Sequence, residues 1–184
     1  MILLIGSLQL GLLYSIMVMG IYLSFRILNI PDLTADGSFT FGVATAALLA
    51  VSGHPILGLV LAALAGGAAG CVTGLLQTKL GIHPVLTGIL TMSGLYSVNT
   101  AVLGGSPNLS LIGKNTIFTM AAQTLPGLGK EGARLLTAAV FAAALVFILT
   151  VFFKTRLGLS IRATGDNVEM VKASSINVDR MKII

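Results

Sequence analysis

Long runs of apolar residues, separated by short polar stretches, dominate the pattern of this chain. Five runs are close to the roughly 20 residues that a helix needs to cross the hydrocarbon core of a bilayer. Gly and Pro mark the gaps in "NIPD", "SGHP", "GIHP", "GGSPN" and "LPGLG". The pattern therefore predicts an all-α integral membrane protein with helices over residues 4–25, 37–52, 55–78, 84–104 and 134–153.

Composition supports this interpretation. Hydrophobic residues make up 55% of the 184 residues and charged residues only 9%, which is too little charge to cover a soluble domain of this size. The mean hydropathy is +0.99. No Lys or Arg precedes the first apolar run, so we expect a retained first helix rather than a cleaved secretory signal.

Basic residues predict the orientation of the chain. The loop 105–133 carries few of them, whereas the tail 154–184 is crowded with them. The basic residues of the tail are Lys154, Arg156, Arg162, Lys172, Arg180 and Lys182. By the positive-inside rule the tail is cytoplasmic, the loop 105–133 is an outer loop, and the N-terminus lies outside. Loop topology thus accounts for the net charge of +5, and no nucleic-acid partner is expected.

The third and fourth apolar runs carry regular patterns of small or polar residues. In the third run, a small residue recurs every four positions at Gly58, Ala62, Gly66, Gly70 and Gly74, which predicts a strip for close helix packing. In the fourth run, Thr87, Thr91, Gly94 and Ser97 are predicted to share one helix face. That face is open to two interpretations, interhelical packing or the lining of a solute pathway.

A polar break follows the first helix in "RILNIPDLTADGSFTFG" (26–42). Its polar residues include Asp32, Thr34, Asp36 and Ser38. In one interpretation the break is an aqueous inner turn, with Asp36 or Ser38 capping the next helix. In the other, it is embedded between two broken helices, lines a solute pathway and has Arg26 as a candidate ion-pair partner.

The tail differs in character from the rest of the chain. Asp166 and Glu169 have capping-box spacing, which predicts a short helix from about Asn167 to Ala173. Asn177 has the appearance of a second helix cap. A short rigid helix on a cytoplasmic loop is suited to docking, and a solvated connector is the alternative interpretation.

The tail sequence "GDNVEMVKASSINVDRMK" resembles the cytoplasmic coupling loop of ABC importer permeases of the branched-chain amino acid and ribose permease superfamily. The matching positions are Gly165, Asn167, Ile176, Asn177 and Lys182, and Ser175 stands where glycine is usual. The stretches "PDLTADGSF", "TKLGIHPVLTGILTMSGLYSVN" and "IRATGDN" are most similar to a subgroup linked to tryptophan or tyrosine import.

The resemblance implies a permease subunit in the bacterial cytoplasmic (inner) membrane, in contact with lipid. A second permease chain, as a homodimer, two cytoplasmic ATPase subunits and an extracytoplasmic solute-binding protein are the implied partners. The ATPase-coupling residues would be Gly165, Asp166, Asn167, Glu169, Ala173, Ile176, Asn177 and Lys182. The chain has no Walker A sequence, so ATP and Mg would bind to the partner ATPase. No catalytic residue, metal site or cofactor is expected in this chain, which would not itself be an enzyme.

Family members continue with further spans after the coupling loop, so the resemblance implies a C-terminally truncated form. Two other functions remain open at this point. An ion-coupled secondary transporter would use Asp32 or Asp36 and need no ATPase. A membrane scaffold would use the polar residues for packing alone. Uptake of an aromatic amino acid is expected only by analogy with the subgroup.

Overall fold

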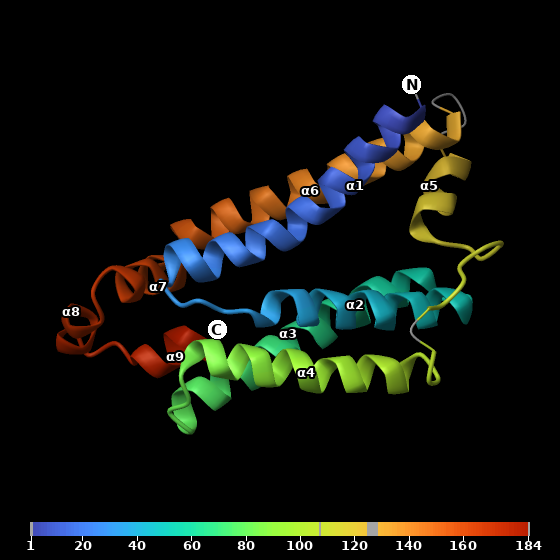
Figure 1. Cartoon of the computed structure of the whole chain (residues 1–184). Helices are drawn as coiled ribbons and strands as arrows, with labels where there is room; N and C mark the ends of the chain where they lie inside the picture. Colours follow the sequence, from blue (N-terminus) through green and yellow to red (C-terminus); the bar gives the residue numbers. More distant parts are fainter. Residues whose placement is uncertain (1, 107, 125–128, 184) are drawn as a thin grey trace.

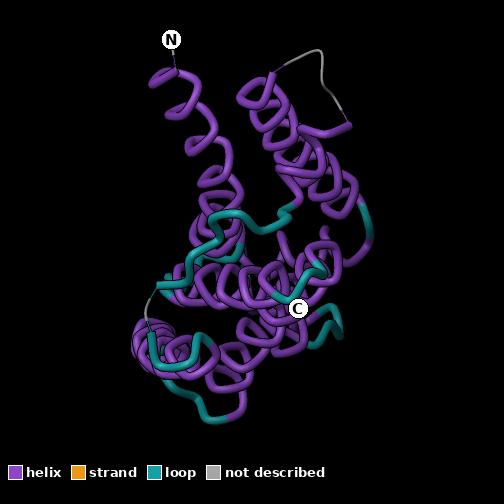
Figure 2. The backbone as a smooth tube through the Cα atoms, turned by 90° about the vertical axis from the view of Figure 1, so that its right-hand side faces the viewer, coloured by secondary structure: helices purple, strands orange, loops and turns teal. Residues whose placement is uncertain are grey.

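The computed structural model describes residues 2–106, 108–124 and 129–183, and these are folded into helices joined by turns and loops. Figure 2 shows no strand among the described residues. The prediction of an all-α fold is therefore confirmed.

Five helices are long and apolar enough to cross a membrane. The candidate spans cover Leu3–Ile27, Thr34–Val51, Pro55–Lys79, Pro84–Val102 and Gly129–Lys154. The first is α1 (Ile2–Tyr22) continued by a π-helical turn, η1 (Leu23–Ile27), and the others are α2, α3, α4 and α6. The chain is a multi-pass membrane protein, and the predicted number of spans is confirmed.

The starts of the helices follow local chemistry. Helices α3 and α4 begin at Pro55 and Pro84, since proline fits the first helical turn, where its missing N–H needs no partner. Helix α2 begins at Thr34, three residues before the predicted start at 37. The cap-like contact comes from Asp32, whose Oδ1 accepts a hydrogen bond from the Thr34 N–H at 2.8 Å. Asp36 lies inside the first turn, so the suggested caps at Asp36 and Ser38 are wrong.

The helices form two groups that meet at one end (Figure 1). Helix α1 packs along α6, while α2 packs against both α3 and α4. At one end, α7 (Arg156–Asp166), α8 (Val168–Ala173) and α9 (Val178–Ile183) connect the groups, because α7 contacts α6 and η1 while α9 contacts α3. At the other end, α5 (Ile117–Thr124) packs on α6.

The region predicted as an outer loop over 105–133 is partly helical. Helix α5 lies within it, and α6 begins at Gly129 rather than at 134. Residues 107 and 125–128 of that loop, and residue 184 of the tail, lie outside the described residues.

Small residues bring α3 close to its neighbours. A Cβ on Gly58 would lie 3.1 Å from the carbonyl oxygen of Ala46 on α2, and one on Gly66 would lie 3.6 Å from that of Ser38. Farther along, Gly74 faces α9, where a Cβ would lie 3.0 Å from the Cα of Ile183. Ala62 is half-buried, and its carbonyl oxygen lies 3.3 Å from a Cβ placed on Gly42. Gly70 differs, because it is exposed and has no such neighbour within 4 Å.

Candidate functional site

The end of the molecule that holds α7, α8 and α9 begins with a tight turn after α6. Thr155 caps α7 by accepting a hydrogen bond from the Gly158 N–H at 3.3 Å. A Cβ on Gly158 would overlap the Phe152 carbonyl, so only glycine allows the chain to fold back so closely. Helix α7 was not predicted as a separate helix from the sequence. Its buried residues, Gly158, Ile161 and Thr164, recur every three positions, but only one of them is strongly apolar.

The predicted short helix is present as α8, but its cap differs. Asn167 has an extended backbone, and its Oδ1 accepts hydrogen bonds from the N–H groups of Glu169 and Met170, both at 3.1 Å. Asp166 is instead the last residue of α7, so the capping-box assignment to Asp166 is wrong. An exposed ion pair joins Lys172 to Glu169 at 3.1 Å. Asn167 supplies the cap because its extended backbone places its amide oxygen over the first free N–H groups.

Helix α8 ends in a Schellman motif. The Ile176 N–H donates to the Val171 carbonyl at 3.3 Å, and the Ser175 N–H donates to the Lys172 carbonyl at 3.1 Å. Ser175 has φ +59°, the left-handed conformation that favours glycine. Helix termination therefore has the usual geometry even though serine stands at the position of the usual glycine.

The C-terminal end of α7 lies directly against the end of η1. A Cβ on Gly165 would overlap the carbonyl oxygen of Ile27, so the two backbones are in contact. Asn29, in the left-handed region at φ +54°, donates from Nδ2 to the Gly165 carbonyl at 3.2 Å. Asn29 lies three residues before Asp32, at the start of the polar break.

The second contact of this region is between α9 and α3. Gly74 faces Ile183, and the neighbouring Thr73 donates to the Thr34 hydroxyl of α2 at 3.1 Å. Thr73 and Thr34 are both almost fully buried. Helix α7 thus contacts the polar break at Gly165, and α9 packs on α3 next to Thr73, which bonds to Thr34 of the break. We call α7, α8 and α9 with these two glycine contacts the bracket.

The eight candidate ATPase-coupling residues differ in their exposure to solvent. The exposed ones are Asp166, Asn167, Glu169, Ala173 and Asn177, and the half-buried ones are Gly165, Ile176 and Lys182. Val171, on the inner face of α8, is 1% exposed and fixes the helix to its neighbours.

The polar break itself is only partly buried. Thr34 is buried, Asp32 and Ser38 are half-buried, and Asp36 is exposed. Arg26 is exposed, and neither of the two ion pairs found within the described ranges involves it. The suggested pairing of Arg26 with the carboxylates of the break is therefore absent from the described part of the chain.

Helix α4 presents part of its predicted polar face to α2. Thr87 and Thr91 are buried, with exposed fractions of 0% and 8%. Gly94 and Ser97 are exposed, so these two residues lie outside the buried stripe of α4. The buried stripe instead continues through Leu95 to Asn99, four residues at a time. Asn99 was not among the polar residues predicted to share this face.

Three buried polar atoms in the described part of the chain have no hydrogen-bond partner. They are Ser38 Oγ, Thr91 Oγ1 and Asn99 Oδ1. All three belong to α2 or α4, the pair of helices that holds the polar break and the threonine stripe. Buried polar groups without partners are uncommon and cost free energy, so this helix pair holds unused hydrogen-bonding capacity.

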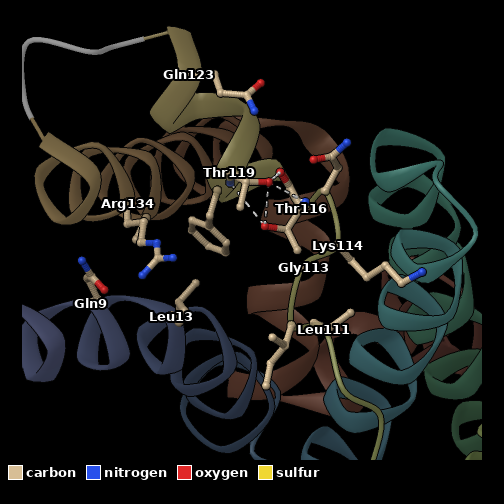
Figure 3. Close-up of a pocket in the computed structure, with 13 residues that line it drawn as sticks. Gln9, Leu13, Leu111, Gly113, Lys114, Thr116, Thr119, Gln123 and Arg134 are labelled. Atoms are coloured by element: carbon tan, nitrogen blue, oxygen red, sulfur yellow. Dashed lines mark hydrogen bonds between the residues drawn. The ribbon is translucent and has the colours of Figure 1, made fainter.

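A cavity of about 610 Å³ lies at the opposite end of the molecule, between α1, α5, α6 and residues 111–116 (Figure 3). Arg134 and Gln9 face it from α6 and α1, and Thr116 and Thr119 hydrogen-bond to one another at its α5 side. A second cavity, of about 340 Å³, adjoins the α2–α3 turn at His54. The two cavities share Asn115 and Gln123.

No cluster of three or more His, Cys, Asp or Glu side chains suited to a metal ion occurs in residues 2–106, 108–124 and 129–183. The polar groups at both ends of the molecule are instead amides, hydroxyls and separate charges, which are suited to hydrogen bonding and docking.

Comparison with known proteins gives consistent matches across the chain. The family described as "Branched-chain amino acid transport system / permease component" matches residues 3–184. The tyrosine transport system permease protein of Clostridioides difficile (strain R20291) is 36% identical over 179 residues, covering 95% of this chain and 56% of that protein. The galactose/methyl galactoside import permease protein of Escherichia coli (strain K12) is 34% identical over 129 residues, covering 67% of this chain and 37% of that protein. No solved structure matches.

An uncharacterized protein of Rickettsia prowazekii (strain Madrid E) is 31% identical over 168 residues, covering 91% of this chain and 56% of that protein. The chain thus spans about half the length of the relatives that it matches over most of its own length. Since the family model covers nearly the whole chain, this protein belongs to the family of permease components of branched-chain amino acid transport systems.

Proposed function

We propose that this chain forms part of the solute pathway of an ABC importer and couples to a separate ATPase subunit. The observation that carries the proposal is α8, a short capped helix exposed at one end of a bundle of membrane spans. Its outer surface carries Glu169, Met170 and Lys172, while Val171 anchors it from within. Family membership supports the same role.

The orientation of the protein follows from its charges. The bracket end carries the basic residues of the tail, which the positive-inside rule places in the cytoplasm. The cavity end and the N-terminus then face the outside. In the bacterial inner membrane this arrangement presents α8 to a cytoplasmic ATPase and α5 to an extracytoplasmic solute-binding protein.

The bracket supplies a route from the ATPase to the solute pathway. Movement of α8 would reach the end of η1 through Gly165 and Asn29, and would reach α3 through α9 and Gly74. Between these two contacts lies the polar break, where Thr34 bonds to Thr73. Because rigid helices and packed backbones transmit displacement, this region is placed to convert ATPase closure into a change in the break.

The solute pathway would run between α2 and α4, which hold Asp32, Thr34, Asp36, Ser38, Thr87 and Thr91. The unpaired Ser38 and Thr91 hydroxyls support this assignment, since a passing solute could use their free hydrogen-bonding capacity. Ser97 is exposed and would contribute only if another chain covered it. A second permease chain, in a homodimer, would complete the pathway.

The solute class that we propose is an amino acid, with an aromatic one favoured. The similarity to a tyrosine transport system permease protein supports it at 36% identity, above the similarity to sugar import permeases. ATP and Mg²⁺ would bind to the ATPase subunit.

Capture of the ATPase tests the proposal. The tagged chain is coexpressed with candidate ATPase subunits, purified in detergent and probed for a bound ATPase. Wild type should retain it, and the Asn167→Ala/Glu169→Ala variant should lose it because α8 loses its cap. Met170→Asp, which changes the exposed surface and leaves the cap intact, should weaken capture as well. Asn115→Ala, at the opposite end, should leave capture unchanged. A folded wild-type chain that captures no ATPase would refute the assignment.

An ion-coupled transporter is the second candidate, and the structure lends it less support. Asp32 accepts a hydrogen bond from the α2 backbone, and Asp36 lies exposed in the first turn of α2. Helix capping and the helix dipole thus account for both carboxylates without a bound ion. Uptake driven by a proton or sodium gradient in the absence of ATPase would favour this candidate.

A further inference from the structure

The cavity between α1, α5 and α6 has the size and mixed lining of a small-molecule site. Its volume of about 610 Å³ lies within the range of roughly 300–1,000 Å³ typical of ligand pockets. Apolar walls come from Leu13, Leu111 and Phe118, and polar groups come from Gln9 and Arg134. The lining residues, all within the described part of the chain, include no Asp or Glu.

Arg134 supplies a cationic group on the α6 side. One of its nitrogens, Nη1, donates to Glu131 Oε1 at 3.2 Å, which orients the guanidinium. A guanidinium has five N–H donors, so others remain to bind a planar carboxylate. The side chain is 43% exposed, which leaves it accessible from the cavity.

Gln9 supplies the complementary group on the α1 side. Its Nε2 donates to the Glu131 backbone carbonyl at 2.9 Å, linking α1 to α6. The Oε1 of the same amide is an acceptor suited to an ammonium group. Figure 3 shows Gln9 and Arg134 on the two facing helices, beside Leu13.

We propose that this cavity is an outer recognition site for the headgroup of an α-amino acid with an apolar or aromatic side chain. The carboxylate binds to Arg134, the ammonium group binds to Gln9 Oε1, and the side chain lies against Leu13, Leu111 and Phe118. The proposal rests on the proposed importer function and deepens it, since it assigns the discrimination of amino acids from uncharged sugars to this end of the permease.

The surroundings of the cavity fit an entry site. Lys114 is exposed at its rim and adds a second positive charge that attracts carboxylates. Asn115 and Gln123 also line the second cavity at the α2–α3 turn. The two cavities therefore adjoin both helix groups.

Direct binding tests the inference without the solute-binding protein. The permease chain is reconstituted in phosphatidylcholine vesicles, and binding of radiolabelled L-tyrosine and L-leucine is measured, with ribose as an uncharged probe. Arg134→Gln should weaken amino-acid binding by about 10- to 100-fold, as expected for loss of a hydrogen bond to a charged group. Arg134→Lys should fall between wild type and Arg134→Gln. Lys130→Gln, a nearby charge change outside the cavity, should stay close to wild type.

A second measurement does not depend on any variant folding. The carboxamides of the two amino acids should compete with the labelled acids at least about tenfold more weakly on wild type. Equal competition by acid and carboxamide would overturn the proposal, as would unchanged binding in Arg134→Gln. Absence of binding of both amino acids to wild type would overturn it too.

Two further outcomes would assign the cavity to another ligand and so overturn the proposal. An Arg134→Gln effect that appears only with phosphatidylglycerol in the vesicles would identify a lipid site. Slower uptake with unchanged direct binding would identify a contact with the solute-binding protein. Failure of the importer assignment can be distinguished from failure of this inference. If the importer assignment fails, the wild-type chain captures no ATPase. If only this inference fails, ATPase capture is intact.

Discussion

Replacement of Ser175 by glycine should stabilise α8. Ser175 adopts φ +59° in the Schellman motif, and an L-residue in this region costs about 1–2 kcal/mol. Glycine removes that cost but loses more backbone entropy on folding, about 0.5–1 kcal/mol. The net gain should be about 1 kcal/mol, equivalent to a roughly fivefold smaller population of opened α8.

Hydrogen exchange measures this gain where it occurs. The amides of Ser175 and Ile176 donate to the Lys172 and Val171 carbonyls, so they exchange when the end of α8 opens. Mass spectrometry of peptides that span residues 168–178 should show about fivefold slower exchange at these two amides in Ser175→Gly than in wild type.

The neighbouring position gives a matched control. Ser174 is the C-cap, with φ −84°, and its hydroxyl donates to the Met170 carbonyl at 3.1 Å. Glycine at Ser174 relieves no left-handed strain and removes that hydrogen bond, so exchange should become faster. The assigned strain at Ser175 is absent if Ser175→Gly exchanges as fast as wild type, or if glycine slows exchange equally at both positions.

Three further predictions test the bracket and the helix packing. Asn29→Asp keeps the tolerance for a left-handed backbone but removes the hydrogen-bond donor to the Gly165 carbonyl. The amount of solute transported per ATP hydrolysed should therefore fall in proteoliposomes. An unchanged ratio would exclude a role for this hydrogen bond in coupling. Gly88→Ala places a Cβ 3.0 Å from the backbone nitrogen of Leu33, just before α2, and should lower the free energy of unfolding by about 1–3 kcal/mol in denaturant titrations. Gly94→Ala, which has no neighbour within 4 Å, should be neutral or stabilising by up to about 1 kcal/mol. Equal effects of the two substitutions would contradict the packing of α4. Thr73→Val removes the donor to the buried Thr34 hydroxyl and should lower the free energy of unfolding by about 1–3 kcal/mol in the same titration. Thr73→Ser should retain most of the stability. A neutral Thr73→Val would show that this hydrogen bond contributes little.

The membrane spans could be predicted from the sequence because length and hydropathy alone identify them. The starts at Pro55 and Pro84 were equally predictable, since proline at a helix start is a local signal. The cap of α2 was not, because Asp32 and Asp36 are both good cap residues. The choice between them depends on where the chain leaves the break, which is set by contacts with α7 and α4.

Tertiary packing also decided the details of the candidate sites. A helical face computed at 100° per residue groups Thr87 with Ser97, but the stripe that α2 covers advances four residues at a time and reaches Asn99 instead. The contact of α9 with Gly74 joins segments about a hundred residues apart, and no local pattern in either segment indicates it. The cavity at Arg134 likewise combines three helices and a loop.

The two internal contacts of the bracket are separate from the exposed face of α8. Both contacts are made at glycines and involve the backbone, through Gly165 against Ile27 and Gly74 against Ile183. The exposed face of α8 takes part in neither contact. If α8 docks on an ATPase as proposed, its side chains can change to fit a different ATPase while these two backbone contacts stay the same. Exchange of the outward-facing residues of α8 between relatives should transfer the choice of ATPase without rebuilding the membrane helices.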